Sequence, residues 1–131
     1  MRRSELNRFK KLFEDFGLQV PSEKIEREYG QLSRSETEGQ IKILTLALIE
    51  RRRLLLGLPT FYEIAVGKGQ TMTDEDVQAF IRHVGEHGEI WSAEEVKEKY
   101  GNCSLLDALA VWFNERALPA CREALNRVLA D

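Results

Sequence analysis

Residues 33–59 read SRSETEGQIKILTLALIERRRLLLGLP, and this stretch decides the fold. Ser33 and Glu36 have the spacing of a capping box, in which a hydroxyl and a carboxylate bind the free N–H groups at a helix N-terminus. Gly57 can adopt the left-handed conformation that ends many helices, and Pro59 cannot easily continue one. The residues between these signals are therefore predicted to form one long central helix.

The two sides of this predicted helix differ in character. At about 100° per residue, one broad arc is apolar and is expected to be buried: Ile43, Leu44, Ala47, Leu48, Leu54 and Leu55. Arg51 falls within that arc, so it either pairs with a carboxylate or marks the point where the helix leaves the core. The opposite side mixes charged and apolar side chains.

That mixed side supplies the candidate partner-binding residues, which are Lys42, Ile49, Arg52, Arg53 and Leu56. Ile49 and Leu56 are two helical turns apart on one stripe, as in a helix–helix seam. Two interpretations stay open. Another part of the same chain covers this side, or it contacts another protein or a second copy, because apolar anchors within an Arg-rich rim are common at interfaces.

The rest of the chain also repeats helical spacing, and no segment has the alternation typical of a strand. Glycine and proline divide the helical segments, with breaks expected near Gly17, Gly30, Gly57, Gly67, Gly88, Gly101 and Pro119. The sequence therefore predicts an all-α protein with a single domain over residues 1–131, a compact multi-helix bundle of about eight helices.

The order of these signals repeats along the chain. At an offset of 71 residues, Leu6, Phe9, Phe13, Gly17 and Tyr29 recur as Val77, Phe80, Val84, Gly88 and Tyr100. Leu58-Pro59 recurs as Leu118-Pro119 at an offset of 60. The difference of 11 residues is close to three turns, so the third helix is shortened without rotating its exit. The pattern favours two four-helix repeats, near 4–67 and 74–130.

Composition places the chain among ordinary globular proteins, with 43% hydrophobic and 31% charged residues. The net charge of −3 argues against a dedicated nucleic-acid binder, although residues 1–70 carry +3 and residues 71–131 carry −6. Cys103 and Cys121 occupy apolar helical positions and are expected to be small buried hydrophobes. Without a leader before the first helix, and with no apolar run of about 20 residues, we expect a cytoplasmic protein that does not span a membrane.

One short motif has the spacing of a metal site. His83, Glu86 and His87 spell H-x-x-E-H, which resembles the zinc-binding motif of the inverzincin peptidases. The resemblance covers five residues, and no equivalent of that family's further carboxylate ligand can be identified. We expect the two histidines to face solvent and to hold no metal. No catalytic set and no cofactor motif has a meaningful spacing, so an enzyme is not predicted.

The sequence thus favours a non-enzymatic helical protein-interaction or regulatory module, whose target is another protein or a second copy as a homodimer. The alternative is a nucleic-acid-associated regulator that uses a basic N-terminal face. Its candidate residues are Arg2, Arg3, Arg8, Lys10, Lys11, Arg51, Arg52 and Arg53.

Overall fold

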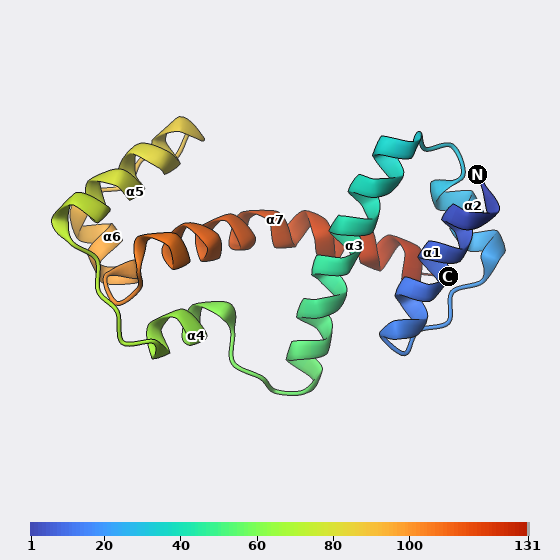
Figure 1. Ribbon diagram of the computed structural model, residues 1–131, viewed down its shortest axis with the longest axis horizontal. Coiled ribbons are helices and arrows are strands. Elements are labelled where there is room, and N and C mark those ends of the chain that lie inside the picture. Colours follow the sequence, from blue (N-terminus) through green and yellow to red (C-terminus); the bar gives the residue numbers. More distant parts are fainter. Residues whose placement is uncertain (131) are drawn as a thin grey trace. The chain divides into compact units, whose positions relative to one another are not determined.

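The computed structural model describes residues 1–130, and in that range the chain is all-helical, with no strand. Seven helices follow one another (Figure 1): α1 (Arg3–Asp15), α2 (Ser22–Tyr29), α3 (Arg34–Leu55), α4 (Phe61–Gly67), α5 (Asp74–Glu86), α6 (Ala93–Tyr100) and α7 (Leu105–Leu129). The all-α prediction is confirmed, and one helix fewer is found than the sequence suggests.

Capping boxes set the start of four helices. The predicted box at α3 is present, since the Ser33 hydroxyl accepts from the Glu36 amide and the Glu36 carboxylate accepts from the Ser33 amide. The same reciprocal pair begins α4 at Thr60, α5 at Thr73 and α6 at Ser92. Each box satisfies N–H groups that have no partner inside the helix, which fixes where the helix begins.

The chain divides into two compact units. Unit 1 comprises residues 1–57 together with 117–130, and unit 2 comprises residues 58–116. Unit 1 therefore contains α1, α2, α3 and the C-terminal half of α7. Unit 2 contains α4, α5, α6 and the N-terminal half of α7. The unit boundaries fall inside the two predicted repeats rather than between them.

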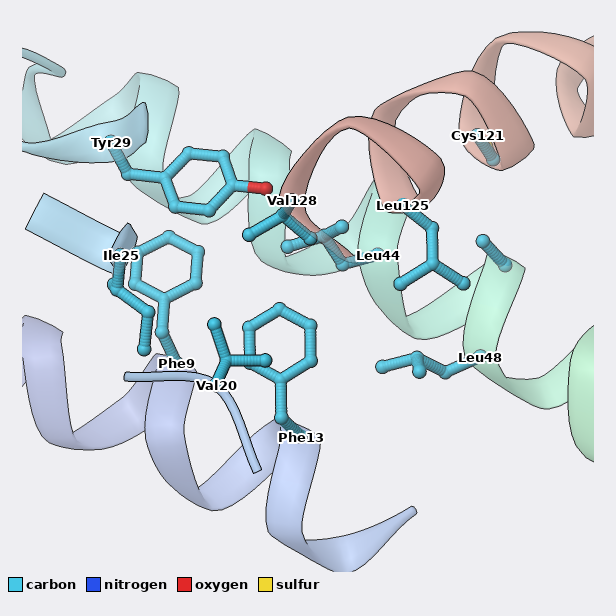
Figure 2. Close-up of a cluster of buried hydrophobic side chains, with 11 residues drawn as sticks. Phe9, Phe13, Val20, Ile25, Tyr29, Leu44, Leu48, Cys121, Leu125 and Val128 are labelled. Atoms are coloured by element: carbon cyan, nitrogen blue, oxygen red, sulfur yellow. The ribbon is translucent and has the colours of Figure 1, made fainter. Parts of the chain in front are cut away.

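The core of unit 1 is built from three segments that are far apart in sequence (Figure 2). Phe9 and Phe13 of α1 are fully buried, and the Phe9 ring stacks on Tyr29 with the centroids 4.6 Å apart. Leu44 and Leu48 contribute from α3. The C-terminal half of α7 completes the cluster with Cys121, Leu125 and Val128.

The core of unit 2 is aromatic. Phe80 and Tyr100 are fully buried, with ring centroids 5.1 Å apart, and Trp91 packs edge-on against Phe80. Tyr62 of α4 reaches the same cluster: its ring meets Tyr100 edge-on, and its hydroxyl donates to the backbone carbonyl of Lys99. Both cysteines are free and buried, Cys103 in this core and Cys121 in the core of unit 1.

The predicted break at Pro119 is wrong, and it accounts for the missing eighth helix. α7 runs without interruption from Leu105 to Leu129 with Pro119 in its interior (Figure 1). Proline in a helix interior removes one backbone hydrogen bond, at a cost of about 3 kcal/mol. Leu118 before it and Cys121 after it are buried, and the burial of apolar side chains on both sides of the proline favours the continuous helix.

Local geometry recurs between the two units. α5, α6 and α7 begin 71 residues after α1, α2 and α3, and the ends of the first two pairs keep the same offset. Gly17 and Gly88 end their helices with φ of 76° and 86°, a conformation that favours glycine. In both turns the next amide donates back to a core residue, Leu18 to the Phe13 carbonyl and Glu89 to the Val84 carbonyl.

Candidate protein-interaction surface

The C-terminal end of α3 extends beyond the core of unit 1. Leu44, Ala47 and Leu48 are buried, as predicted, but the apolar arc does not continue inward to Leu54 and Leu55. These two side chains are 66% and 70% exposed, so their predicted burial is wrong. Of the two interpretations of Arg51, the structure supports the second: the helix leaves the core at about this position.

Three consecutive leucines are therefore presented to solvent. Leu54, Leu55 and Leu56 are each about two-thirds exposed at the end of α3. Single exposed leucines are ordinary, but a contiguous apolar group is uncommon on a monomeric surface and is typical of binding sites. We name this feature, together with Arg51 and Arg52 beside it, the α3 end surface.

Two grooves flank Leu55 in unit 1. The first, of about 190 Å³, is lined by Phe16, Leu48, Arg51, Arg52, Leu55 and Leu56. The second, of about 340 Å³, is lined by Ala47, Glu50, Arg51, Leu54, Leu55, Arg122, Leu125 and Asn126. Apolar side chains and arginines thus form both walls, which is the composition expected where an apolar side chain of a partner is held within a charged rim.

The Arg52 side chain makes two contacts with the C-terminal end of α1. Its Nη2 donates to the backbone carbonyl of Asp15 at 2.6 Å, and its guanidinium lies 4.2 Å from the centroid of the Phe16 ring. Asp15 is the last residue of α1, so the cation also meets the negative end of that helix dipole. Two fixed contacts reduce the side-chain freedom of Arg52, and therefore the entropy that would be lost on binding.

The five predicted partner-binding residues fall into two groups. Arg52 and Leu56 line the same groove. Lys42, Ile49 and Arg53 lie outside both grooves, and Ile49 is 36% exposed. The structure therefore brings together the C-terminal part of the predicted set and adds Phe16, Arg51, Leu54 and Leu55, which sequence analysis did not include.

The basic N-terminal face is partly neutralised within unit 1. Arg8 forms a bidentate pair with Glu38, and Lys11 pairs with Asp15 at 3.8 Å. The Glu38 hydrogen bond raises the pKa of Arg8 above its ordinary value. These two cations and Arg52, which are among the candidate phosphate contacts, therefore already have protein partners.

The two histidines of unit 2 are not simply solvent-facing, which corrects the sequence prediction. The His83 and His87 rings lie 4.9 Å apart, and both pack against Trp112, with centroid distances of 5.9 and 5.5 Å. His87 is exposed, whereas His83 is half-buried. The two histidines therefore take part in aromatic packing with Trp112.

A charged cluster lies beside these rings. Arg116 donates to both carboxylate oxygens of Glu89 at 2.6 and 2.7 Å, and the Trp91 indole donates to the same carboxylate at 3.0 Å. These hydrogen bonds, that of Arg116 above all, lower the pKa of Glu89 to about 2. The cluster ties the turn after α5 to α7.

Residues 1–130 contain no group of three or more His, Cys, Asp or Glu side chains arranged to hold a metal ion. Across the same range, no helix combines the length and the apolar content needed to cross a bilayer. Comparison of the chain with protein-family models, curated proteins and solved structures finds no match. Functional inference therefore depends on the α3 end surface itself.

Proposed function

We propose that this chain is a non-enzymatic helical interaction module that binds another protein through the α3 end surface. The observation that supports the proposal is the exposure of Leu54, Leu55 and Leu56, each about two-thirds accessible, between two grooves with arginine in their walls. Leucine side chains anchor a partner by leaving water, and the arginines favour a partner of opposite charge.

The chemistry of the surface indicates the kind of partner. An amphipathic helix can place apolar residues at i and i+4 into adjacent grooves, and acidic residues beside them would meet Arg51 and Arg52. A second copy of the chain also has suitable charge. Residues 58–116 hold 5 Lys and Arg against 11 Asp and Glu, whereas residues 1–57 and 117–131 hold 14 against 11.

The test compares two serine variants of the full chain. Parent protein, Leu55→Ser and Leu106→Ser are immobilised and exposed to extract from the native host, and retained proteins are identified by mass spectrometry. Leu106 is the matched control, because it is 78% exposed but lies in unit 2. We expect a protein that parent and Leu106→Ser retain and Leu55→Ser loses. Equal retention by all three would contradict the proposal.

Self-association is tested in the same series. Solution mass is measured against concentration for the parent and for Leu55→Ser. A parent dimer that the substitution abolishes identifies the second copy as the partner. A monomeric parent assigns the surface to another protein.

The nucleic-acid alternative makes a different prediction. A protein that neutralises phosphates with arginine and lysine loses affinity steeply as salt increases. Duplex DNA binding by the parent with such a slope, reduced by Arg51→Gln and unchanged by Leu55→Ser, would replace the protein-interaction proposal with the alternative.

We also infer that the helix series α1–α2–α3 and α5–α6–α7 are copies of one ancestral motif. The constant offset of 71 residues, the left-handed glycines Gly17 and Gly88, and the stacked or tilted pairs Phe9–Tyr29 and Phe80–Tyr100 support this duplication.

The two free, buried cysteines fit a reducing compartment such as the cytoplasm.

A further inference from the structure

Unit 1 is built from two stretches of the chain that unit 2 separates in sequence. α4 follows α3 in sequence but belongs to unit 2, and residues 117–130 follow the first half of α7 but belong to unit 1. The chain therefore crosses between units twice, after Gly57 and after Arg116. Unit 2 is one continuous stretch, whereas unit 1 is completed by a segment that the chain reaches only after it has passed through unit 2.

Residues 117–130 make a specific set of contacts with unit 1. Cys121, Leu125 and Val128 are at most 4% exposed and face the cluster that contains Phe13 and Leu48 (Figure 2). Arg122 donates through Nη2 to Glu50 of α3 at 2.7 Å, and the Glu50 side chain is only 15% exposed. Both apolar packing and an ion pair thus hold this segment in unit 1.

The first crossing coincides with a break in secondary structure. Gly57, with φ of 65°, ends α3, and no helix resumes until Phe61. At the second crossing α7 is continuous, with Pro119 in its interior. An exchange that opens the chain at residues 57–60 keeps α7 intact and re-forms the same contacts inside each unit.

We propose that two copies of the chain associate by exchanging residues 117–130. In the monomer this segment completes unit 1 of its own chain, and in the dimer it completes unit 1 of the second copy. Exchange of identical elements is a low-cost route to dimers, because every contact in the dimer already exists in the monomer. The partner is a second copy because the surface under residues 117–130 fits their sequence. The inference does not depend on the α3 end surface.

The Glu50–Arg122 pair provides a test with two full-length variants. In Glu50→Arg, and separately in Arg122→Glu, the two positions carry like charges within one chain. The two variants are unfolded together and refolded at high concentration. Only a dimer of one Glu50→Arg chain and one Arg122→Glu chain that exchange residues 117–130 places opposite charges at positions 50 and 122 in unit 1 of both chains. We expect native mass spectrometry to detect this heterodimer in about tenfold excess over the homodimers. Its melting temperature should approach that of the parent.

A matched control uses the Glu89–Arg116 pair. Both residues belong to the continuous segment 58–116, so exchange of residues 117–130 cannot restore their pairing. Glu89→Arg and Arg116→Glu refolded together should therefore yield no heterodimer. The double variant Glu50→Arg/Arg122→Glu restores the pair within one chain and checks that each change permits folding. Monomers alone from the first mixture, or equal heterodimer formation in the control, would overturn the proposal.

Discussion

Truncation of Leu125 to alanine is a direct probe of how α7 completes unit 1. Leu125 is 4% exposed and lies among Phe13, Leu44 and Leu48 (Figure 2). The change removes three carbon groups, worth about 0.8 kcal/mol each on burial, or about 2 kcal/mol. The cavity that remains adds about 1 kcal/mol more. We therefore expect Leu125→Ala to lower the free energy of unfolding by about 3 kcal/mol.

The assay is urea denaturation followed by two spectroscopic signals. Far-UV circular dichroism reports helix in both units, whereas Trp91 and Trp112, the two tryptophans of the chain, both lie in unit 2. Tryptophan fluorescence in the absence of urea should therefore match the parent and show that unit 2 remains folded. Leu106→Ala is the matched control, because Leu106 is 78% exposed and such changes alter stability by about 0.5 kcal/mol or less.

The reasoning would be refuted if Leu125→Ala cost less than about 1 kcal/mol, the range of exposed or poorly packed sites. A loss no larger than that of the control would mean that residues 117–130 do not belong to the core of unit 1. The proposed segment exchange would then lose its basis as well.

Three further predictions concern other parts of the fold. Pro119→Ala should raise the free energy of unfolding by about 2 kcal/mol in chemical denaturation, because a helix interior regains the amide that proline lacks; a loss of stability would contradict the continuous α7. Tyr29→Ala should cost about 3 kcal/mol by the same measurement, since a buried ring stacked on Phe9 is removed; a cost near zero would place that ring outside the core. The third is a pH dependence: Glu89 has a folded pKa of about 2, below its ordinary value of 4.5, so its stabilising contribution is complete above about pH 4.5 and is lost as the pH falls toward 2. Both partners are about a third exposed, so the loss should be about 1 kcal/mol in thermal melts. It should become smaller in Arg116→Gln, which keeps the Trp91 hydrogen bond to Glu89; an unchanged acid dependence in that variant would refute the assignment.

Local signals in the sequence account for most helix boundaries. Ser33, Thr73 and Ser92 begin helices because each precedes a carboxylate at the capping-box spacing, and that information lies within four residues. Gly17 and Gly88 end helices for an equally local reason, since the left-handed conformation strongly favours glycine. Thr60 carries the same signal for α4 and could have been identified from its spacing to Glu63.

Features that depend on distant contacts were not predictable in this way. In the sequence Pro119 indicates a break, but in the structure the helix continues through it, with Leu118 and Cys121 buried on either side. Leu55 lies on the same apolar arc as Leu48, yet it is exposed because the arc extends beyond the helices that pack against α3. The sequence of α3 alone does not show where those neighbouring helices end. Periodicity identifies which residues share a face, and the extent of the neighbouring helices decides which of them are buried.

Only part of the candidate surface was predicted, because some of its residues are brought there by contacts between distant segments of the chain. Arg52 and Leu56 could be selected because an apolar residue on a charged face is conspicuous in the sequence. Phe16 and Arg51 could not, since their contribution depends on where the end of α1 meets α3.

The measurement that tests the account most directly is the affinity of a captured, purified partner for the parent, Leu55→Ser and Leu106→Ser, by isothermal titration calorimetry. Loss of a central apolar anchor costs about 2 kcal/mol or more, so we predict an affinity at least about 30-fold weaker for Leu55→Ser. Leu106→Ser should bind as tightly as the parent. Equal affinity of all three proteins would contradict the claim that the end of α3 is the binding surface.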